Sequence, residues 1–408
     1  MRSNLLGVAL IALIIPFAAQ AQLSNDVSGD AVRIGVLTDM AGVTADVTGK
    51  GSLVAAEMAV REIGGTVLGK PVQVISADHQ HKPDIGTGIA RQWFDVEGVD
   101  AIVDVPNSGV ALAIQGLARE KKRIVLYSGA GTTALTNEQC SPFGVHWTYD
   151  TYAVSHGTAS AVVKAGGTSW FFLAADYAFG QQLQKDASNV IVAAGGKVLG
   201  GVRHPLNTPD FSSFLLTAQS SGAKVIGVAN AGNDTINAMK QANEYGIVKG
   251  GQSLAAMILF LQDIHTLGLE AAQGTYLTTA SYWDMNEATR AWSKEFMSKT
   301  GMPPSMLHAG VYGAVRHYLK AVTKAGTDDA EKVAAAMREV PIDDVFSQDA
   351  KLREDGRVTR TMYLARVKKP SESKYPWDYL EIVRPIPPEE TVWPLAESKC
   401  PLVKGTSR

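Results

Sequence analysis

The chain has 408 residues, a formal net charge of -2 at pH 7 and 46% hydrophobic residues. This apolar content excludes a disordered chain, and the length predicts two domains. The near-neutral charge, without a notable basic cluster, argues against a nucleic-acid-binding protein.

The N-terminal segment has the pattern of an export signal. Arg2 supplies a positive charge, residues 5–18 are apolar, and Ala19-Gln20-Ala21 is a small-residue cleavage site. The apolar stretch is short for a membrane span, so we expect a signal peptide of residues 1–21 that is removed after Ala21. A retained membrane anchor is the alternative. The chain is therefore expected to be exported.

Short apolar runs and amphipathic segments then alternate along the chain. In the first half, strands are expected at 32–37, 71–77, 101–105 and 123–127, and helices at 52–65, 84–98 and 109–122. A second series places strands at 169–175 and 224–229 and helices at 181–196, 211–222 and 235–246. Such alternation predicts βαβ units, parallel sheets and right-handed crossovers.

The remaining third of the chain returns to helices, expected at 288–301, 306–326 and 329–340. The segments LREDGRV and TMYLARVKK are typical of hairpin strands turned at Asp355-Gly356. We predict an α/β fold of two Rossmann-like lobes with parallel sheets. Lobe I is expected to contain residues 30–148 and 281–358, and lobe II residues 149–280 together with 359–408, which include the C-terminal tail.

Ligands of open parallel sheets bind outside the carboxyl ends of the strands, which directs attention to two loops of lobe I. Ser108 follows one strand and can cap the next helix, and its hydroxyl and nearby N–H groups can face a carboxylate. In SGAGTT, Gly129 and Gly131 allow close backbone approach, and Thr132 offers a hydroxyl. An ordinary N-cap and an ordinary turn are the alternatives. SGAGTT lacks the lysine and spacing of a phosphate-binding loop.

Lobe II contributes its own polar and aromatic candidates. Phe179 could stack on a ligand, and Asn230 and Asp234 could hydrogen-bond to it. Alternatively, Phe179 packs in the core and Asp234 caps a helix. Tyr282 and Trp283 lie at an expected lobe crossover, where they either line the cleft or pack the hinge.

No catalytic or metal-binding pattern stands out. His79 and His81 follow a strand without an obvious third ligand, and a solvated turn is the favoured interpretation. His308 and His317 are nine residues apart, which is the wrong spacing for a helical metal pair. There is no G-x-S-x-G elbow and no convincing pair of nucleophile and base. We expect neither an enzyme nor a bound metal or cofactor.

The two cysteines, Cys140 and Cys400, are expected to be bonded, because an isolated pair in an exported protein is often a disulfide. The bond would tie the C-terminal tail to the first half of the chain. Two separate thiols are the alternative.

Several motifs, taken in order, carry a resemblance to a known family. They are VRIGVLTDMAG, GKPVQVISADHQ, VPNS, SGAGTT, WFFLAADYAFG, HPLNTPDFSSFLLTAQSSGAK, ANAGNDT and SYWD. With the export signal, they resemble the periplasmic solute-binding proteins of ABC importers, in particular the branched-chain amino acid type. The resemblance covers nearly the whole mature chain and implies a type I periplasmic-binding fold, in which two lobes joined by a three-strand hinge close on a ligand. It also implies a periplasmic location, membrane ABC permease subunits as partners and, we expect, a monomer.

The resemblance also assigns site residues. It implies that Ser108 and residues Ala130, Gly131 and Thr132 hold a ligand carboxylate, with Phe179 on the other side. The family's tyrosine in the first loop falls on Val47, and no acid for a ligand ammonium stands in the apolar run 255–261. Asp263 comes late, in the following helix. Either Asp234 substitutes, or the ligand has no amine.

The expected function is therefore the capture of a small carboxylate-bearing solute by hinge closure. The solute would be an amino acid, an amine-free aromatic or aliphatic carboxylate, or an amide. Two other classes stay open: a ligand-binding sensor module of the same fold, and an exported hydrolase or amidase. A signalling domain would support the sensor, and turnover of a bound ligand would reveal the enzyme.

Overall fold

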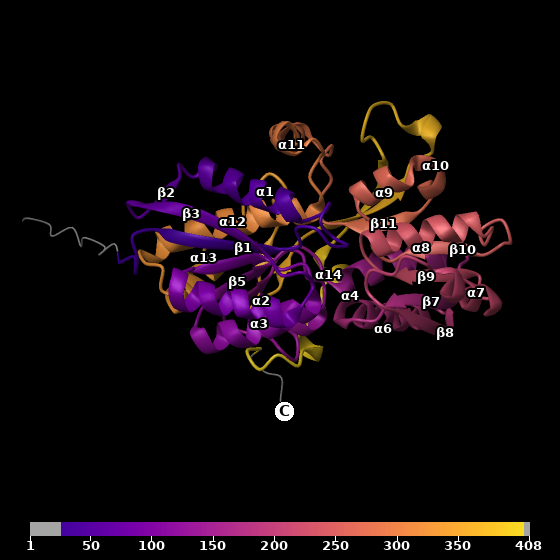
Figure 1. The fold of residues 1–408 in the computed structure, drawn as a ribbon, viewed down its shortest axis with the longest axis horizontal. Helices are drawn as coiled ribbons and strands as arrows, with labels where there is room; N and C mark the ends of the chain where they lie inside the picture. The colour runs from indigo at the N-terminus through magenta and orange to yellow at the C-terminus, as the bar shows by residue number, and fades with distance from the viewer. Residues whose placement is uncertain (1–25, 404–408) are drawn as a thin grey trace, which may run out of the picture.

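The computed structural model describes residues 26–403, which form two α/β lobes side by side (Figure 1). The first lobe is built on a six-stranded sheet of order β2-β3-β1-β4-β5-β6, parallel except for the β2–β3 pair. Its strands are β1 (Val32–Thr38), β2 (Thr66–Val67), β3 (Lys70–Asp78), β4 (Ala101–Asp104), β5 (Ile124–Tyr127) and β6 (Gly144–His146).

Helices cover both faces of this sheet. One apolar cluster joins the sheet to α1 (Gly49–Glu62), α11 (Glu287–Thr300), α12 (Met306–Ala325) and α13 (Ala330–Glu339). A second cluster joins the other face to α2 (Pro83–Gln92) and α3 (Ser108–Lys121). Strands buried on both faces read as continuous apolar runs rather than alternating ones, which is why the sequence pattern located them.

The second lobe contains a parallel four-stranded sheet of order β10-β9-β7-β8. Its strands are β7 (Ser169–Ala175), β8 (Lys197–His204), β9 (Val225–Ala229) and β10 (Ser253–Ala256). The helices of this part of the chain are α4 (Thr151–Val154), α5 (Ser160–Lys164), α6 (Ala178–Ala193), α7 (Ser212–Ser220), α8 (Asn233–Glu244), α9 (Leu261–Leu267) and α10 (Leu269–Ala272). The predicted α/β fold with parallel sheets is confirmed.

An antiparallel sheet of order β11-β14-β15 adjoins the second lobe. It contains β11 (Tyr276–Thr279), β14 (Met362–Val367) and β15 (Leu380–Ile386). The expected turn at Asp355-Gly356 is present, and it joins β12 (Lys351–Leu352) to β13 (Val358–Thr359). The second half of the predicted hairpin is wrong, because residues 362–367 pair with β11 and β15 instead. The predicted lobe boundaries stay a prediction.

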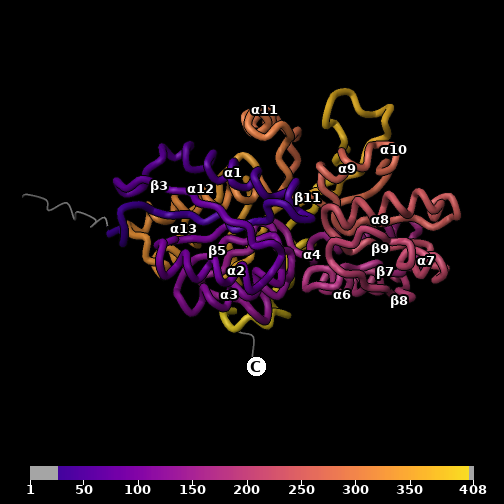
Figure 2. Tube along the Cα trace, in the orientation of Figure 1, coloured from indigo at the N-terminus to yellow at the C-terminus, as the bar shows by residue number. Residues whose placement is uncertain are grey.

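The C-terminal tail returns to the first lobe (Figure 2). After α14 (Pro388–Thr391), Cys400 forms a disulfide with Cys140, with Cα atoms 5.6 Å apart. The predicted pairing is confirmed, and both half-cystines are buried. Between residues 26 and 403, no helix is long and apolar enough to cross a membrane. The predicted signal peptide lies outside the described residues.

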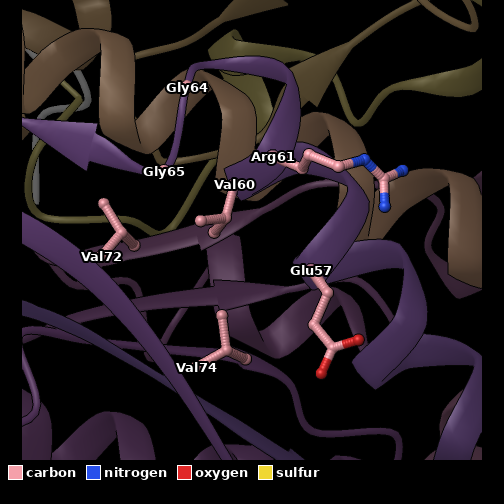
Figure 3. Close-up of a pocket in the computed structure, with 7 residues that line it drawn as sticks. All are labelled: Glu57, Val60, Arg61, Gly64, Gly65, Val72 and Val74. Atoms are coloured by element: carbon pink, nitrogen blue, oxygen red, sulfur yellow. The ribbon is translucent and has the colours of Figure 1, made fainter.

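A surface groove of about 510 Å³ lies between α1 and β3 (Figure 3). It is lined by Glu57, Val60, Arg61, Gly64, Gly65, Val72 and Val74. These residues come from the C-terminal half of α1, from the turn that follows it and from the first half of β3. The groove therefore lies away from the carboxyl ends of the strands, where ligands of this fold class bind.

Candidate functional site

Ser108 does not cap α3, because its neighbour Asn107 does. Asn107 is the N-cap of α3, with its side chain accepting a hydrogen bond from the Val110 amide at 3.0 Å. The expectation that Ser108 caps this helix is therefore wrong, because Ser108 is already the first helical residue. Its fully buried hydroxyl instead accepts from the amides of Gly131 at 3.4 Å and Thr132 at 3.2 Å. Two loops predicted separately thus meet at one hydroxyl.

The turn that leads into Ser108 has an unusual backbone. Asp104 and Val105 have φ angles of 84° and 52°, in the left-handed region that β-branched residues rarely adopt. The Asp104 carboxylate accepts a hydrogen bond from the Thr38 hydroxyl at 2.7 Å, and burial raises the pKa of Asp104 to about 6. Strain of this kind persists only where the surroundings enforce it, and it is concentrated at ligand sites.

The segment after β5 is fixed from both sides. The Thr132 hydroxyl accepts from the Ala134 amide at 3.4 Å, and the Ala130 carbonyl contacts the His146 ring nitrogen Nε2 at 2.7 Å. Further along, the Gly131 carbonyl accepts from the Thr151 amide at 2.8 Å. All three residues of the predicted anion loop are buried. The amides of Gly131 and Thr132 hold the Ser108 oxygen, and the hydroxyls of Ser108 and Thr132 can therefore act as preorganised donors to a negatively charged group.

His79 and His81 do not lie in a solvated turn, so that interpretation is wrong. His79 is fully buried, which lowers its pKa to about 3, and the side chain of His81 is only 6% exposed. Atom Nε2 of His81 contacts an Asp39 carboxylate oxygen at 2.7 Å, and Nδ1 contacts the Asn107 side-chain nitrogen at 3.1 Å. Burial opposes ionisation of Asp39, but the contact with His81 helps to hold its pKa below the usual range. Within residues 26–403, no group of three potential metal ligands comes together.

This network also defines the tautomer of His81. The oxygen of the Asn107 amide is occupied by the helix cap, so its nitrogen must donate to Nδ1 of His81. Nδ1 is then an acceptor, and the ring proton sits on Nε2, where it donates to Asp39. The buried chain Asp39–His81–Asn107 therefore holds the residue that precedes Ser108 in one orientation.

Phe179 brings the second lobe onto the anion loop. It lies in the first turn of α6, and a Cβ added at Gly131 would be 2.7 Å from its ring. The Tyr149 ring lies edge-on to Phe179 with centroids 6.5 Å apart, and its hydroxyl donates to the Gly129 carbonyl at 3.1 Å. Phe179 also belongs to an apolar cluster that includes Val47. It therefore packs in a core and covers the predicted loop at once.

Asn230 follows β9 and is fully buried. Its side-chain oxygen contacts Nε2 of His204 at 2.9 Å, which directs the amide nitrogen away from that ring. Among the described residues, this nitrogen has no hydrogen-bond partner. A buried donor without a partner is costly, so an incoming acceptor would be stabilising.

Asp234 does not cap α8, because Gly232 occupies the N-cap position. Its two carboxylate oxygens accept from the amides of Asn207 and Thr208, each at 3.1 Å. Burial raises its pKa, and His81 of the first lobe is close enough to act on its charge. The carboxylate therefore already has donors within its own lobe.

Tyr282 is not brought together with the other predicted residues. Its hydroxyl donates to the Trp377 carbonyl at 3.0 Å, and its ring packs against Trp283 and an apolar cluster at the antiparallel sheet. Asp263 lies in α9, as expected, and accepts from the Phe260 amide at 3.0 Å. Burial raises the pKa of Asp263 to about 7.

Sequence reasoning missed Asp39, Asn107 and the role of His81. The asparagine directly before a helix start is a recognised N-cap signal and could have been found. The other two residues are distant in sequence from each other, and no local pattern connects them.

The chain matches the family model described as "Periplasmic binding protein" over residues 31–374. It is 25% identical over 378 residues to the Leu/Ile/Val-binding protein homolog 6 of Brucella melitensis, covering 90% of this chain and 94% of that protein. A periplasmic binding protein from Burkholderia mallei has a TM-score of 0.90 and 50% identity, covering 92% of this chain and 100% of the other. A branched chain amino acid ABC transporter periplasmic ligand-binding protein from Burkholderia xenovorans has a TM-score of 0.81 and 41% identity, covering 91% of this chain and 100% of the other.

Proposed function

This chain belongs to the periplasmic binding protein family and is a substrate-binding protein of the ABC-transporter, branched-chain amino acid type, and from this we propose that it captures a small carboxylate-bearing solute by closing its two lobes. The family is extracytoplasmic and consists of binding proteins rather than enzymes. We further propose that the chain acts as a monomer, is cleaved after Ala21, and delivers its solute to membrane permease subunits.

The observation that carries the proposal is the convergence at Ser108. Its hydroxyl lies at the start of α3 and meets two backbone amides from the loop after β5. Amides at a helix N-terminus attract anions through unsatisfied N–H groups and the helix dipole. The Ser108 oxygen already accepts from the two loop amides, so a solute carboxylate placed there would accept from the Ser108 hydroxyl, from the Thr132 hydroxyl and from the first N–H groups of α3.

The acids considered as partners of a ligand ammonium support a solute without one. Asp39, Asp234 and Asp263 each accept hydrogen bonds from backbone amides of their own lobe. A buried ammonium needs a charged partner to offset its desolvation, and these carboxylates are already engaged. Phe179 and Tyr149 next to Gly131 favour an apolar or aromatic body on the solute. The Asn230 amide nitrogen is proposed to donate to an acceptor on the solute, at the end opposite its carboxylate.

Replacing Ser108 or Thr132 by alanine is expected to weaken carboxylate binding by about 1–3 kcal/mol each, because a charged acceptor loses a donor. Isothermal titration calorimetry with a carboxylate that binds the unmodified protein measures the change. Ser212→Ala is the matched control, since Ser212 also begins a helix but lies in α7, outside this site. Unchanged affinity in both site variants would remove the carboxylate assignment.

The proposed solute class is tested by a thermal-shift screen after unfolding and refolding to remove carried-over ligand. The panel pairs each amino acid with its amine-free analogue, and adds aromatic carboxylates and amides. A solute at about 100 times its dissociation constant adds roughly 2.7 kcal/mol, which gives a measurable shift. Shifts with the amine-free members alone are expected. Shifts that require the amine would contradict the proposal that the solute has no ammonium group, and Asp234 would then be the first residue to mutate.

A further inference from the structure

The two lobes touch through backbone atoms at the loop between β1 and α1. The loop between β1 and α1 presents the carbonyl of Val43, which accepts a hydrogen bond from the amide of Asn233 at 2.9 Å. Asn233 is the first residue of α8 in the second lobe. The first amides of a helix have no partner within the helix, so this donor is available without loss of a helical hydrogen bond.

Gly232 makes this approach possible. Its φ angle is 54°, and a Cβ added there would lie 1.9 Å from the Val43 carbonyl oxygen and 3.4 Å from the Cα of Thr44. No side chain fits between the two backbones. The contact therefore depends on a glycine for two separate reasons, namely its left-handed backbone and the absence of Cβ.

Apolar contacts flank this hydrogen bond. Val47, from the same first-lobe loop, is buried in a cluster with Phe179 and Ala231 of the second lobe. Phe179 also lies against Gly131 of the first lobe. These contacts are made between protein groups, so they stabilise the closed arrangement without help from a solute.

We propose that the Val43 carbonyl, Gly232 and the Asn233 amide form a backbone latch that favours the closed arrangement of the lobes in the absence of solute. The proposal rests on hinge closure as the proposed mode of capture. A latch of this kind raises the fraction of binding-competent molecules, so less of the solute's binding free energy is spent on closing the lobes. It also makes solute entry depend on transient opening of the latch.

The test compares Asn233→Pro with Asn233→Ala in the full chain, refolded free of solute. Proline removes the N–H donor and directs its ring Cδ at the Val43 carbonyl, so it opposes the contact in two ways, while it is well tolerated at the first position of a helix. Alanine keeps the donor and removes the same exposed side chain, which makes it the matched control. The radius of gyration from small-angle X-ray scattering reports opening, and far-UV circular dichroism reports the fold.

Asn233→Pro is expected to increase the radius of gyration, through a rise of about 3- to 10-fold in the ratio of open to closed molecules, as for the loss of one neutral hydrogen bond. Asn233→Ala is expected to leave the radius unchanged. If both variants or neither expand, the latch is overturned.

Amide hydrogen exchange of the unmodified, solute-free protein decides the matter if the proline variant does not fold. The Asn233 amide should exchange at least about tenfold more slowly than that of Glu287, the exposed first residue of α11. Equal rates would overturn the latch. Both measurements are made without solute, so a failed latch leaves the carboxylate screen intact, and a failed screen leaves the latch intact.

Discussion

Replacing Asp150 by alanine is expected to lower the free energy of unfolding by about 3–5 kcal/mol, because it leaves a buried arginine without its counter-ion. The Asp150 carboxylate contacts Nε of Arg357 at 2.8 Å, and the two side chains are 2% and 3% exposed. Arg357 also donates to the His146 carbonyl at 3.1 Å. The pair therefore joins the segment that leaves the first lobe before α4 to the turn between β12 and β13.

Controls separate the ion pair from the helix cap. Asp150 is also the N-cap of α4, accepting from the Ala153 amide at 2.8 Å. Asp150→Asn keeps a cap oxygen and removes the charge, so it should lower the free energy of unfolding by most of the amount expected for Asp150→Ala. Asp329→Ala removes an exposed cap, from α13, and should cost about 0.5–2 kcal/mol. Urea unfolding measures all three variants, and a loss for Asp150→Ala no larger than for Asp329→Ala would contradict the ion-pair argument.

Removing the disulfide is the second large effect. The Cys140→Ser, Cys400→Ser double variant is expected to lose about 2–5 kcal/mol of unfolding free energy, because the bond closes a long loop in the unfolded chain. The two cysteines are 260 residues apart. The cysteines also pack with Val403 in a small apolar cluster, so the tail should detach more readily from the first lobe.

The reference for this prediction is the unmodified protein with and without reductant. Reductant should lower its stability to that of the double variant and leave the double variant unchanged. Thiol titration of the denatured, unreduced protein should find no free thiol. Two titratable thiols would contradict the bond itself. Equal stability of the unreduced, unmodified protein and the double variant would contradict only the expected loss of unfolding free energy.

The sequence by itself determined the fold class, because strands such as 124–127 and 225–229 are buried on both faces and therefore read as uninterrupted apolar runs. It also located the two loops of the proposed anion-holding site. Parallel strands direct their carboxyl ends to one edge, so Ser108 and Thr132 had to be neighbours if β4 and β5 paired, as they do. The disulfide could also be predicted from the sequence, because the chain has two cysteines, which allow one pairing, and an exported protein meets an oxidising environment.

Prediction from the sequence failed, or stayed undecided, for side chains whose contacts come from distant segments of the chain. The sequence favours a solvated turn for His81 because the residue follows a strand and has no obvious third metal ligand, but Asp39 and Asn107 contact its ring from two other loops. The sequence does not decide whether Tyr282 lines the cleft or packs the hinge. In the structure its hydroxyl donates to the carbonyl of Trp377, which is 95 residues away in the chain. In each case the deciding contact spans tens of residues, beyond the reach of a local pattern.

Only the tertiary structure decided how closely the lobes approach. A glycine at 232 reads as an ordinary turn residue, and nothing near it in sequence points to Val43. The need for glycine arises because two backbones from different lobes meet there, with the Asn233 amide bonded to the Val43 carbonyl. Local propensity determines which segments become strands and helices, whereas contacts between lobes depend on packing that no single segment encodes.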